Sequence, residues 1–292
     1  MKHTQNFLNA VKRAHRSSNR NVLTRQHSLY RTSGKVVGLE LTEIVKKHAR
    51  ALGADMVGVC SVEVLKEWSE QGKSLLPKAS SVVVVVCRHS KAAIDSDNIR
   101  MAQFDTHCVY DKLDGILKDL SLFLEDKGFL AASIPIYLPI KMSKETQGLI
   151  GDISLRHAAV EAGLGEMGLN RLLLTKRFGP RIRLGAVLTT APLKPNQRFA
   201  ERICDNCGDC VRACPAGAVT EDEKVDVRKC ARVILKYALP GLVRFLPSLV
   251  GKSEDEVWEA VREPFLWEIW QTMTYGTFYN CFECMKACPI GK

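Results

Sequence analysis

Apolar and polar residues follow helical spacing in three segments between residues 41 and 163. The segment 41–53, LTEIVKKHARALG, predicts a helix that ends at Gly53. The segment 110–128 predicts a longer helix that Gly128 closes. Its apolar residues form one stripe, made of Leu113, Ile116, Leu117, Leu120 and Leu124. The segment 152–163 predicts a third helix, capped by Asp152 and ended by Gly163.

Strand-like apolar runs lie between these helices. The segments 55–60, 80–87 and 181–193 predict strands, and 129–139 is a further short apolar segment. The run SSVVVVVC at 80–87 is β-branched without interruption, which is typical of a strand buried on both faces. Helices that alternate with such strands predict a mixed α/β domain over residues 37–198.

Positive charge is concentrated at the start of the chain. Eight of the ten excess positive charges lie in residues 1–39, before the first acid, Glu40. We expect residues 1–36 to form a basic, flexible leader. A basic arm for nucleic acid or anionic lipid, or an organelle transit peptide, is the alternative interpretation. The remaining chain is nearly neutral, so its charge does not indicate nucleic-acid binding.

The cysteine content points to metals. The chain has eleven cysteines, yet its start lacks the apolar run of a secretory signal. Its longest purely apolar run, at 82–87, is far shorter than the ~20 residues of a membrane span. We therefore expect a cytoplasmic protein whose thiols are reduced and bind metal.

Two motifs near the end of the chain have the spacing of iron–sulfur ligands. The first is CxxCxxCxxxCP, formed by Cys204, Cys207, Cys210 and Cys214. In ferredoxins with two clusters, three cysteines of such a run bind one 4Fe–4S cluster and the fourth binds the other. The second motif, CxxCxxxCP, is one cysteine shorter and comprises Cys281, Cys284 and Cys288. Cys230 is the candidate for the missing ligand.

These eight cysteines supply the eight ligands that two 4Fe–4S clusters need. We assign Cys204, Cys207, Cys210 and Cys288 to the first and Cys214, Cys230, Cys281 and Cys284 to the second. Residues 199–292 are thus predicted to be a bacterial-ferredoxin-like domain, with a helical insert at about 232–279. A structural zinc site is the alternative. Of the other thiols, Cys60 and Cys87 are expected to be small buried residues, and Cys108 lies beside His107.

The glycines of GLGEMG, at 163–168, match the G-x-G-x-x-G pattern of dinucleotide sites. That fingerprint needs a strand before it and an acid about 20 residues later. Here a helix precedes it, and 188–190 contains only apolar and hydroxyl residues. We therefore exclude a dinucleotide site, and expect a tight backbone path or close approach to a bulky flat group.

The run from AGLGEMG to FGPRIRLGAVLTTAPL, followed directly by the two cysteine motifs, resembles two groups of proteins. These are the cobalamin-dependent reductive dehalogenases and the epoxyqueuosine reductases. The resemblance implies a nitroreductase-like domain that binds a corrinoid, whose cobalt the clusters reduce. It implies a corrinoid pocket lined by Gly163, Gly165, Gly168 and Gly179, with Arg183 and Thr189 nearby. Ala132 stands where epoxyqueuosine reductases place an aspartate, so we expect no nucleic-acid partner.

We therefore expect an iron–sulfur and cobalamin-dependent reductase that cleaves a carbon–heteroatom bond in a small or medium organic substrate. The candidates for the catalytic proton donor are Tyr110, Tyr137, Lys141 and His157. FMN is the alternative cofactor, and an electron-transfer or corrinoid-handling protein is the alternative function. The expected electron donor is a ferredoxin, a flavodoxin or a reductase. The 232–279 insert, rich in tryptophan and leucine, is a candidate surface for a docking partner or a membrane.

Overall fold

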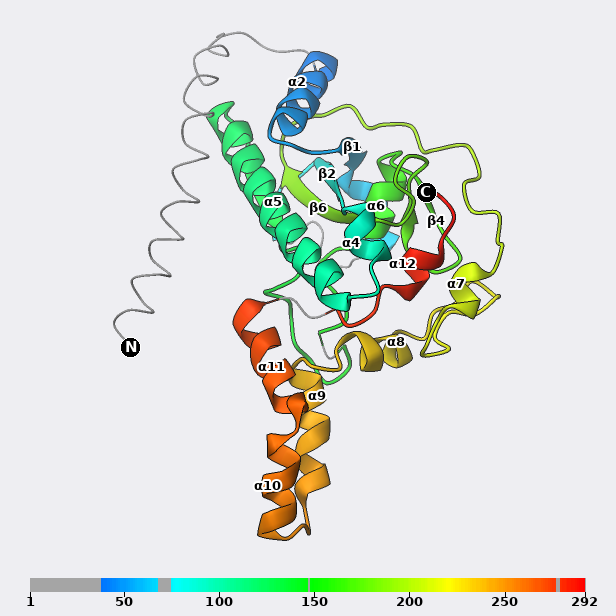
Figure 1. Ribbon diagram of the computed structural model, residues 1–292. Helices are drawn as coiled ribbons and strands as arrows, with labels where there is room; N and C mark the ends of the chain where they lie inside the picture. The colour runs from blue at the N-terminus through cyan, green and yellow to red at the C-terminus, as the bar shows by residue number, and fades with distance from the viewer. Residues whose placement is uncertain (1–37, 68–74, 147, 277–278, 292) are drawn as a thin grey trace. The chain divides into compact units, whose positions relative to one another are not determined.

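The computed structural model describes residues 38–67, 75–146, 148–276 and 279–291, and Gly38–Lys292 form one compact unit (Figure 1). The predicted leader, 1–36, lies outside the described residues. The first part of this unit comprises α2 Gly38–Ala51, β1 Met56–Ser61, η2 Val62–Glu67, β2 Ser81–Arg88, α4 Lys91–Asp95, α5 Ile99–Asp126, β3 Ala131–Ile134, α6 Leu155–Glu161, β4 Glu166–Met167, β5 Leu173–Leu174 and β6 Ile182–Thr189. The second part comprises α7 Asp209–Arg212, α8 Val227–Ile234, α9 Leu239–Phe245, η3 Leu246–Leu249, α10 Glu254–Arg262, α11 Pro264–Tyr275 and α12 Glu283–Ala287.

Four strands form the central sheet, in the order β1-β2-β6-β3. Each neighbouring pair is antiparallel, and β4 and β5 form a separate antiparallel pair. The predicted mixed α/β class is confirmed. The ferredoxin-like assignment of residues 199–292 stays a prediction, because α7, α8 and α12 place the cysteines in short helices and turns of a cysteine-rich region.

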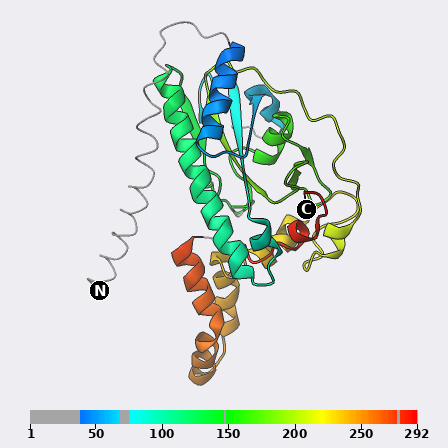
Figure 2. The ribbon, with the colours of Figure 1, turned by 45° about the horizontal axis from the view of Figure 1, so that its top comes forward.

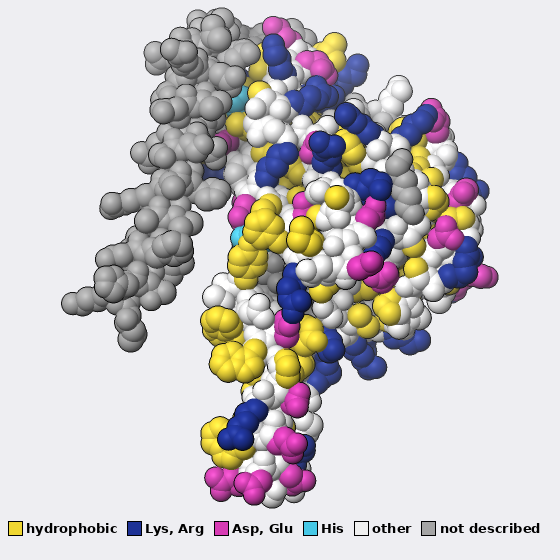
Figure 3. Space-filling model, viewed as in Figure 1, with side chains coloured by type: hydrophobic (Ala, Val, Ile, Leu, Met, Phe, Trp, Pro, Cys, Tyr) yellow, Lys and Arg dark blue, Asp and Glu magenta, His cyan; other side chains and the backbone are white. Residues whose placement is uncertain are grey.

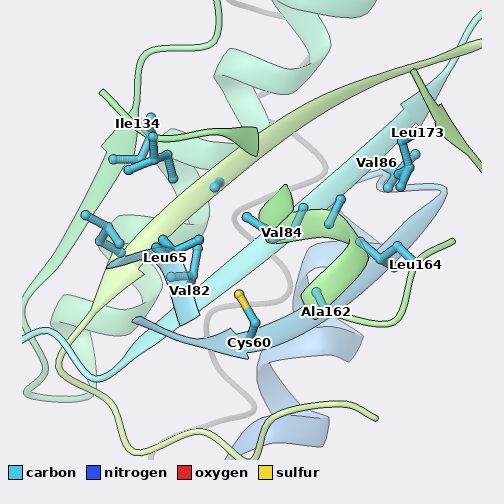
Figure 4. Close-up of a cluster of buried hydrophobic side chains, with 14 of the residues drawn as sticks. Cys60, Leu65, Val82, Val84, Val86, Ile134, Ala162, Leu164 and Leu173 are labelled. Atoms are coloured by element: carbon cyan, nitrogen blue, oxygen red, sulfur yellow. The ribbon is translucent and has the colours of Figure 1, made fainter. Parts of the chain in front are cut away.

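Both faces of β2 are buried, as the uninterrupted valine run predicts. Val82, Val84 and Val86 pack with Ala162 and other residues around α6, in the cluster that Figure 4 shows. The opposite face lies under α5, which runs along the sheet in both ribbon views (Figures 1 and 2). A Cβ on Gly185 of β6 would lie 2.7 Å from Leu117 of α5. Glycine therefore lets α5 pack tightly on the sheet.

The helices follow the predicted periodicity, with two differences at their starts. The stripe of five apolar residues predicted for 110–128 is fully buried in α5. This helix begins earlier than predicted, at Ile99, where the Asn98 side chain accepts the N–H of Arg100. The predicted cap Asp152 is wrong, since α6 begins after Ser154. Gly53, Gly128 and Gly163 have positive φ angles just past their helices, as predicted.

Two further expectations concern burial. Cys60 and Cys87 are buried in the sheet, as predicted, and burial raises the pKa of the Cys60 thiol to about 12. Within the part of the chain that the structure describes, no helix is long and apolar enough to cross a membrane.

Candidate functional site

Four thiols of the cysteine-rich region lie together. The pKa of Cys210 is raised by burial and then by negative charge on Cys288, Cys204 and Cys207. Burial likewise raises the pKa of Cys288, and charge on Cys204 and Cys207 raises it further. Such mutual influence requires short distances between the thiols. The structure thus brings together the four residues that the spacing assigns to the first cluster.

The other four thiols form a second set. The pKa of Cys230 is raised to about 11 by burial and then by Cys281 and Cys214. Burial raises the pKa of Cys284 to about 12, with further contributions from Cys281, Cys230, Cys214 and Cys210. Because Cys210 belongs to the first set, the two sets are neighbours. Cys230, remote from both motifs in sequence, is placed with the residues that it was predicted to complete.

A cavity lies among the thiols of the first set. It is partly open to solvent, and all four thiols line it. Its other walls are formed by Leu169, Asn170, Leu174, Asp205, Asn206, Gly208, Pro289 and Ile290. Among the described residues, no three His, Cys, Asp or Glu side chains are grouped as ligands of a single metal ion. In a 4Fe–4S cluster each thiolate binds a different iron, so the four sulfurs surround a cavity instead of meeting at one point.

Backbone N–H groups point at two of the sulfurs. The N–H of Ala218 donates to Sγ of Cys214 at 3.2 Å. Burial raises the pKa of Cys288, and the N–H of Ile290 opposes this rise by hydrogen bonding to the sulfur. Donors of this kind stabilise thiolate, the form that binds iron, and they tune the potential of a bound cluster.

Arg181, at the start of β6, holds the second motif in place. Its guanidinium is 3% exposed and donates to the carbonyl oxygens of Lys286, Cys288 and Ile290, each at 3.1 Å. The sequence analysis did not identify this residue. Its signal was present in the FGPRIRL segment, but one arginine in a polar turn does not reveal which carbonyls it will reach.

Glu166 plays a similar part for the first motif. Its carboxylate accepts the backbone N–H of Ile203 at 2.7 Å and that of Cys204. The sequence analysis also missed this residue, although it lies within GLGEMG. The segment therefore positions the first thiol of the cluster motif.

The glycines assigned to the corrinoid pocket contact this chain itself. A Cβ would lie 2.1 Å from the Gln197 oxygen at Gly163, 2.0 Å from the Leu174 oxygen at Gly165 and 1.9 Å from the Ile290 oxygen at Gly179. At Gly168 it would lie 2.7 Å from the Leu174 side chain. The tight backbone path that the glycines predict is present, and it explains them without a ligand. Their place in a corrinoid pocket stays a prediction.

Tyrosines and an arginine gather where the sheet meets the end of the chain. The hydroxyl groups of Tyr110 on α5 and Tyr279 are 3.0 Å apart. The Arg183 guanidinium lies over the Tyr279 ring, 4.6 Å from its centroid, and 5.4 Å from the centroid of Tyr110. The ring of Tyr137 lies 5.9 Å from each of the other two rings. Burial and the neighbouring Tyr110 raise the pKa of Tyr137 to about 12.

A histidine and an aspartate extend this polar group. Nδ1 of His89 lies 2.6 Å from Oδ2 of Asp105 on α5. Burial lowers the pKa of His89 to about 4, and Arg183 contributes to this shift. Nε2 of His89 and Nε of Arg183 are buried and have no hydrogen-bond partner among the residues that the structure describes. Two unpaired buried nitrogens fit a ligand that offers polar atoms.

Other predicted residues lie elsewhere. Lys141 is exposed in the chain after β3. His157 is on α6, across the sheet from α5, with Nδ1 2.7 Å from the Ser154 hydroxyl. Thr189 is the last residue of β6, whereas Arg183 lies near the start of that strand. The Thr189 hydroxyl donates to the Leu130 oxygen at 2.9 Å. The structure therefore groups Tyr110, Tyr137 and Arg183, and Tyr279 is a member that sequence reasoning missed.

Two groups of reductases are among the known proteins with similar sequences. A tetrachloroethene reductive dehalogenase of Desulfitobacterium hafniense is 26% identical over 230 residues, which cover 63% of this chain and 39% of that protein. An epoxyqueuosine reductase of Bacillus subtilis is 21% identical over 285 residues, which cover 87% of this chain and 64% of that protein. A scan against protein families finds no match.

Solved structures of the same two groups share the fold. The epoxyqueuosine reductase from Bacillus subtilis superposes with a TM-score of 0.55 at 20% identity, over 86% of this chain and 65% of that one. A reductive dehalogenase, from work on B12-dependent dehalogenation, gives a TM-score of 0.56 at 19% identity, over 84% and 37%. This chain thus spans only part of each relative's length. In sequence and in structure, the chain is a distant homologue of the reductive dehalogenases and the epoxyqueuosine reductases.

Proposed function

We propose that this chain is an iron–sulfur and cobalamin-dependent reductase that cleaves a carbon–heteroatom bond in an organic substrate. The observation that carries the proposal is the grouping of eight thiols into two neighbouring sets of four. The two groups of homologous reductases support it further.

The chain's own residues fit two 4Fe–4S clusters. The cavity among Cys204, Cys207, Cys210 and Cys288 would hold the first, and the set around Cys230 the second. When bound, such clusters transfer single electrons at potentials that reach roughly −700 mV. Cys207 is exposed. An electron donor would therefore dock nearest the first set of thiols.

The residues around Arg183 fit a cofactor with many hydrogen-bonding groups. Its unpaired Nε is a buried donor, and the unpaired Nε2 of His89 is a buried donor or acceptor. The amide side chains and the phosphate of cobalamin can form hydrogen bonds with donors and with acceptors. When bound, cobalamin supplies a low-valent cobalt nucleophile for bond cleavage. Tyr279 is two residues from the ligand Cys281, so this polar group adjoins the second set of thiols.

A proton for the product would come from a tyrosine of the same group. Tyr110 carries a phenol proton beside the Arg183 cation, and the ring of Tyr137 stacks on that of Tyr110. A guanidinium close to a phenol stabilises the phenolate that remains after proton transfer. The chain's residues would thus orient the substrate, hold the proton at the phenol oxygen and supply charge for its transfer.

Anaerobic titration of the reconstituted protein with hydroxocobalamin and with FMN tests the cofactor. We expect a saturable change in the cobalamin spectrum and a dissociation constant at least ten times larger for Arg183→Gln. Arg177→Gln, an exposed arginine elsewhere, is the control. Gly165 is unsuitable for this test, because a side chain there would meet the chain's own backbone. Tight binding of FMN with no binding of cobalamin would contradict the proposal.

One observation favours the alternative, an electron-transfer or corrinoid-handling protein without a substrate. Trp258, Trp267 and Trp270 of the helical insert are each more than half exposed, as on a surface that docks a partner. The two functions differ in turnover. The loaded reductase, supplied with a chemical reductant, should release halide or deoxygenated product from a panel of organohalides and epoxides. A carrier would release none and would reduce the cobalamin of a second protein.

A further inference from the structure

The helical segment formed by α9 and η3, Leu239–Leu249, carries apolar side chains on two adjacent sides. On one side, Leu242, Phe245 and Leu249 are partly buried. The ring of Phe245 packs 5.1 Å from that of Phe265 on α11. This side is accounted for by the packing of the helical pair.

The other side faces solvent. Leu239 is 58% exposed, Val243 59%, Leu246 54% and Val250 84%. The first three follow one another at spacings of four and three residues on one side of the helical segment, and Val250 comes directly after it in extended backbone. These four residues are here called the outer stripe. A contiguous row of exposed apolar side chains on a helix is typical of a surface that contacts another molecule. The outer stripe therefore requires a covering surface.

The stretch of sequence that carries the outer stripe is positively charged, and its Lys252 lies close to Glu256 of α10. Residues 227–252 contain no acid, and their cations are Arg228, Lys229, Arg232, Lys236, Arg244 and Lys252. The acids of the helical pair begin on α10, whose first turn carries Glu254, Asp255 and Glu256. A surface that covers the outer stripe should therefore be apolar and bordered by anions.

An anionic bilayer has both properties. The segment is far shorter than the ~20 residues that span a membrane, so it would lie along the surface. Cations beside an apolar stripe reach lipid phosphates while their stems stay in the apolar layer. Trp267 and Trp270 on α11 are exposed with ring centroids 6.4 Å apart, and tryptophan prefers the boundary between lipid and water. Figure 3 shows hydrophobic side chains exposed along these helices.

We propose that the outer stripe binds the surface of an anionic lipid bilayer, with Arg244 and Lys252 at the lipid phosphates. This inference does not depend on the proposed function. It assigns the covering surface to lipid, and a second copy of the chain or another protein is an outcome of the test.

Vesicle flotation under anaerobic conditions tests the proposal with the full, reconstituted chain. The vesicles are phosphatidylcholine alone, or phosphatidylcholine with about one third phosphatidylglycerol. The double variant Val243→Asp, Val250→Asp removes the stripe, and Arg244→Glu, Lys252→Glu reverses the charge. The control, Leu122→Asp with Lys118→Glu, makes one change of each kind at exposed positions of α5.

Wild type and the α5 control should float with anionic vesicles and bind at least tenfold less to neutral ones. Both stripe variants should lose at least nine tenths of the binding while keeping wild-type iron content and circular dichroism. Flotation that the stripe variants retain would overturn the proposal, because the cations elsewhere would then account for binding. Absence of wild-type flotation would also overturn it. A dimer in light scattering that Val243→Asp, Val250→Asp dissociates, without flotation, would assign the stripe to a second copy.

Discussion

Replacing Arg181 with methionine should destabilise the second cysteine motif and remove one cluster. The substitution keeps an unbranched, flexible side chain but leaves the carbonyl oxygens of Lys286, Cys288 and Ile290 without their buried donor. A hydrogen bond to a charged group contributes about 1.5–3 kcal/mol, and three from one group are not additive. We therefore expect the free energy of unfolding to fall by about 3–5 kcal/mol, a large part of a typical domain's stability.

The assay combines anaerobic guanidinium unfolding with iron analysis. Because Cys288 is assigned to the first cluster, we expect Arg181→Met to retain about four irons and the wild type to bind about eight. Arg177→Met in the same turn is the control, since its exposed guanidinium contributes below about 1 kcal/mol through the Phe178 ring. If Arg181→Met kept its full iron content and unfolded within about 0.5 kcal/mol of wild type, the assigned role would be refuted.

Three further predictions address other parts of the site. Cys230→Ala should lower the iron content to about four per chain, whereas Cys108→Ala should leave it unchanged, as measured by colorimetric iron analysis. Glu166→Ala should lower unfolding free energy by about 1–3 kcal/mol and make the cluster at Cys204 more sensitive to chelators, because two backbone N–H groups lose their acceptor. The pKa of His89 is about 4 in the folded protein, compared with an ordinary value of 6.5. The folded protein therefore holds the imidazole in its neutral form at pH 7. Its contribution to stability should fall by about 2 kcal/mol from pH 7 to pH 5, and unfolding at several pH values should show a flatter profile for His89→Asn.

Much of the architecture follows from local sequence rules. The valine run of β2 specifies a strand buried on both faces, and the α5 stripe specifies the helix that covers one of them. The antiparallel order of the strands could not be derived, because a fully apolar strand does not encode the direction of its neighbours. The start of α6 at Ser154 was missed because Asp152 and Ser154 are equally good caps in sequence.

Seven of the eight thiols were predictable because cysteines that bind iron–sulfur clusters recur at short, fixed spacings, and Cys230 followed from the ligand count. The residues that hold them were not. Arg181 acts over 105 to 109 residues of sequence, and Tyr279 meets Tyr110 across 169 residues. Such contacts depend on how the end of the chain folds back onto the sheet. Local sequence patterns do not predict that arrangement.

Iron and acid-labile sulfide analysis of the anaerobically reconstituted chain, with electron paramagnetic resonance of its reduced form, tests the central claim most directly. Two sets of four thiols predict about eight irons and eight sulfides per chain and the interacting signals of two reduced 4Fe–4S clusters. About four irons, or zinc in place of iron, would contradict the account.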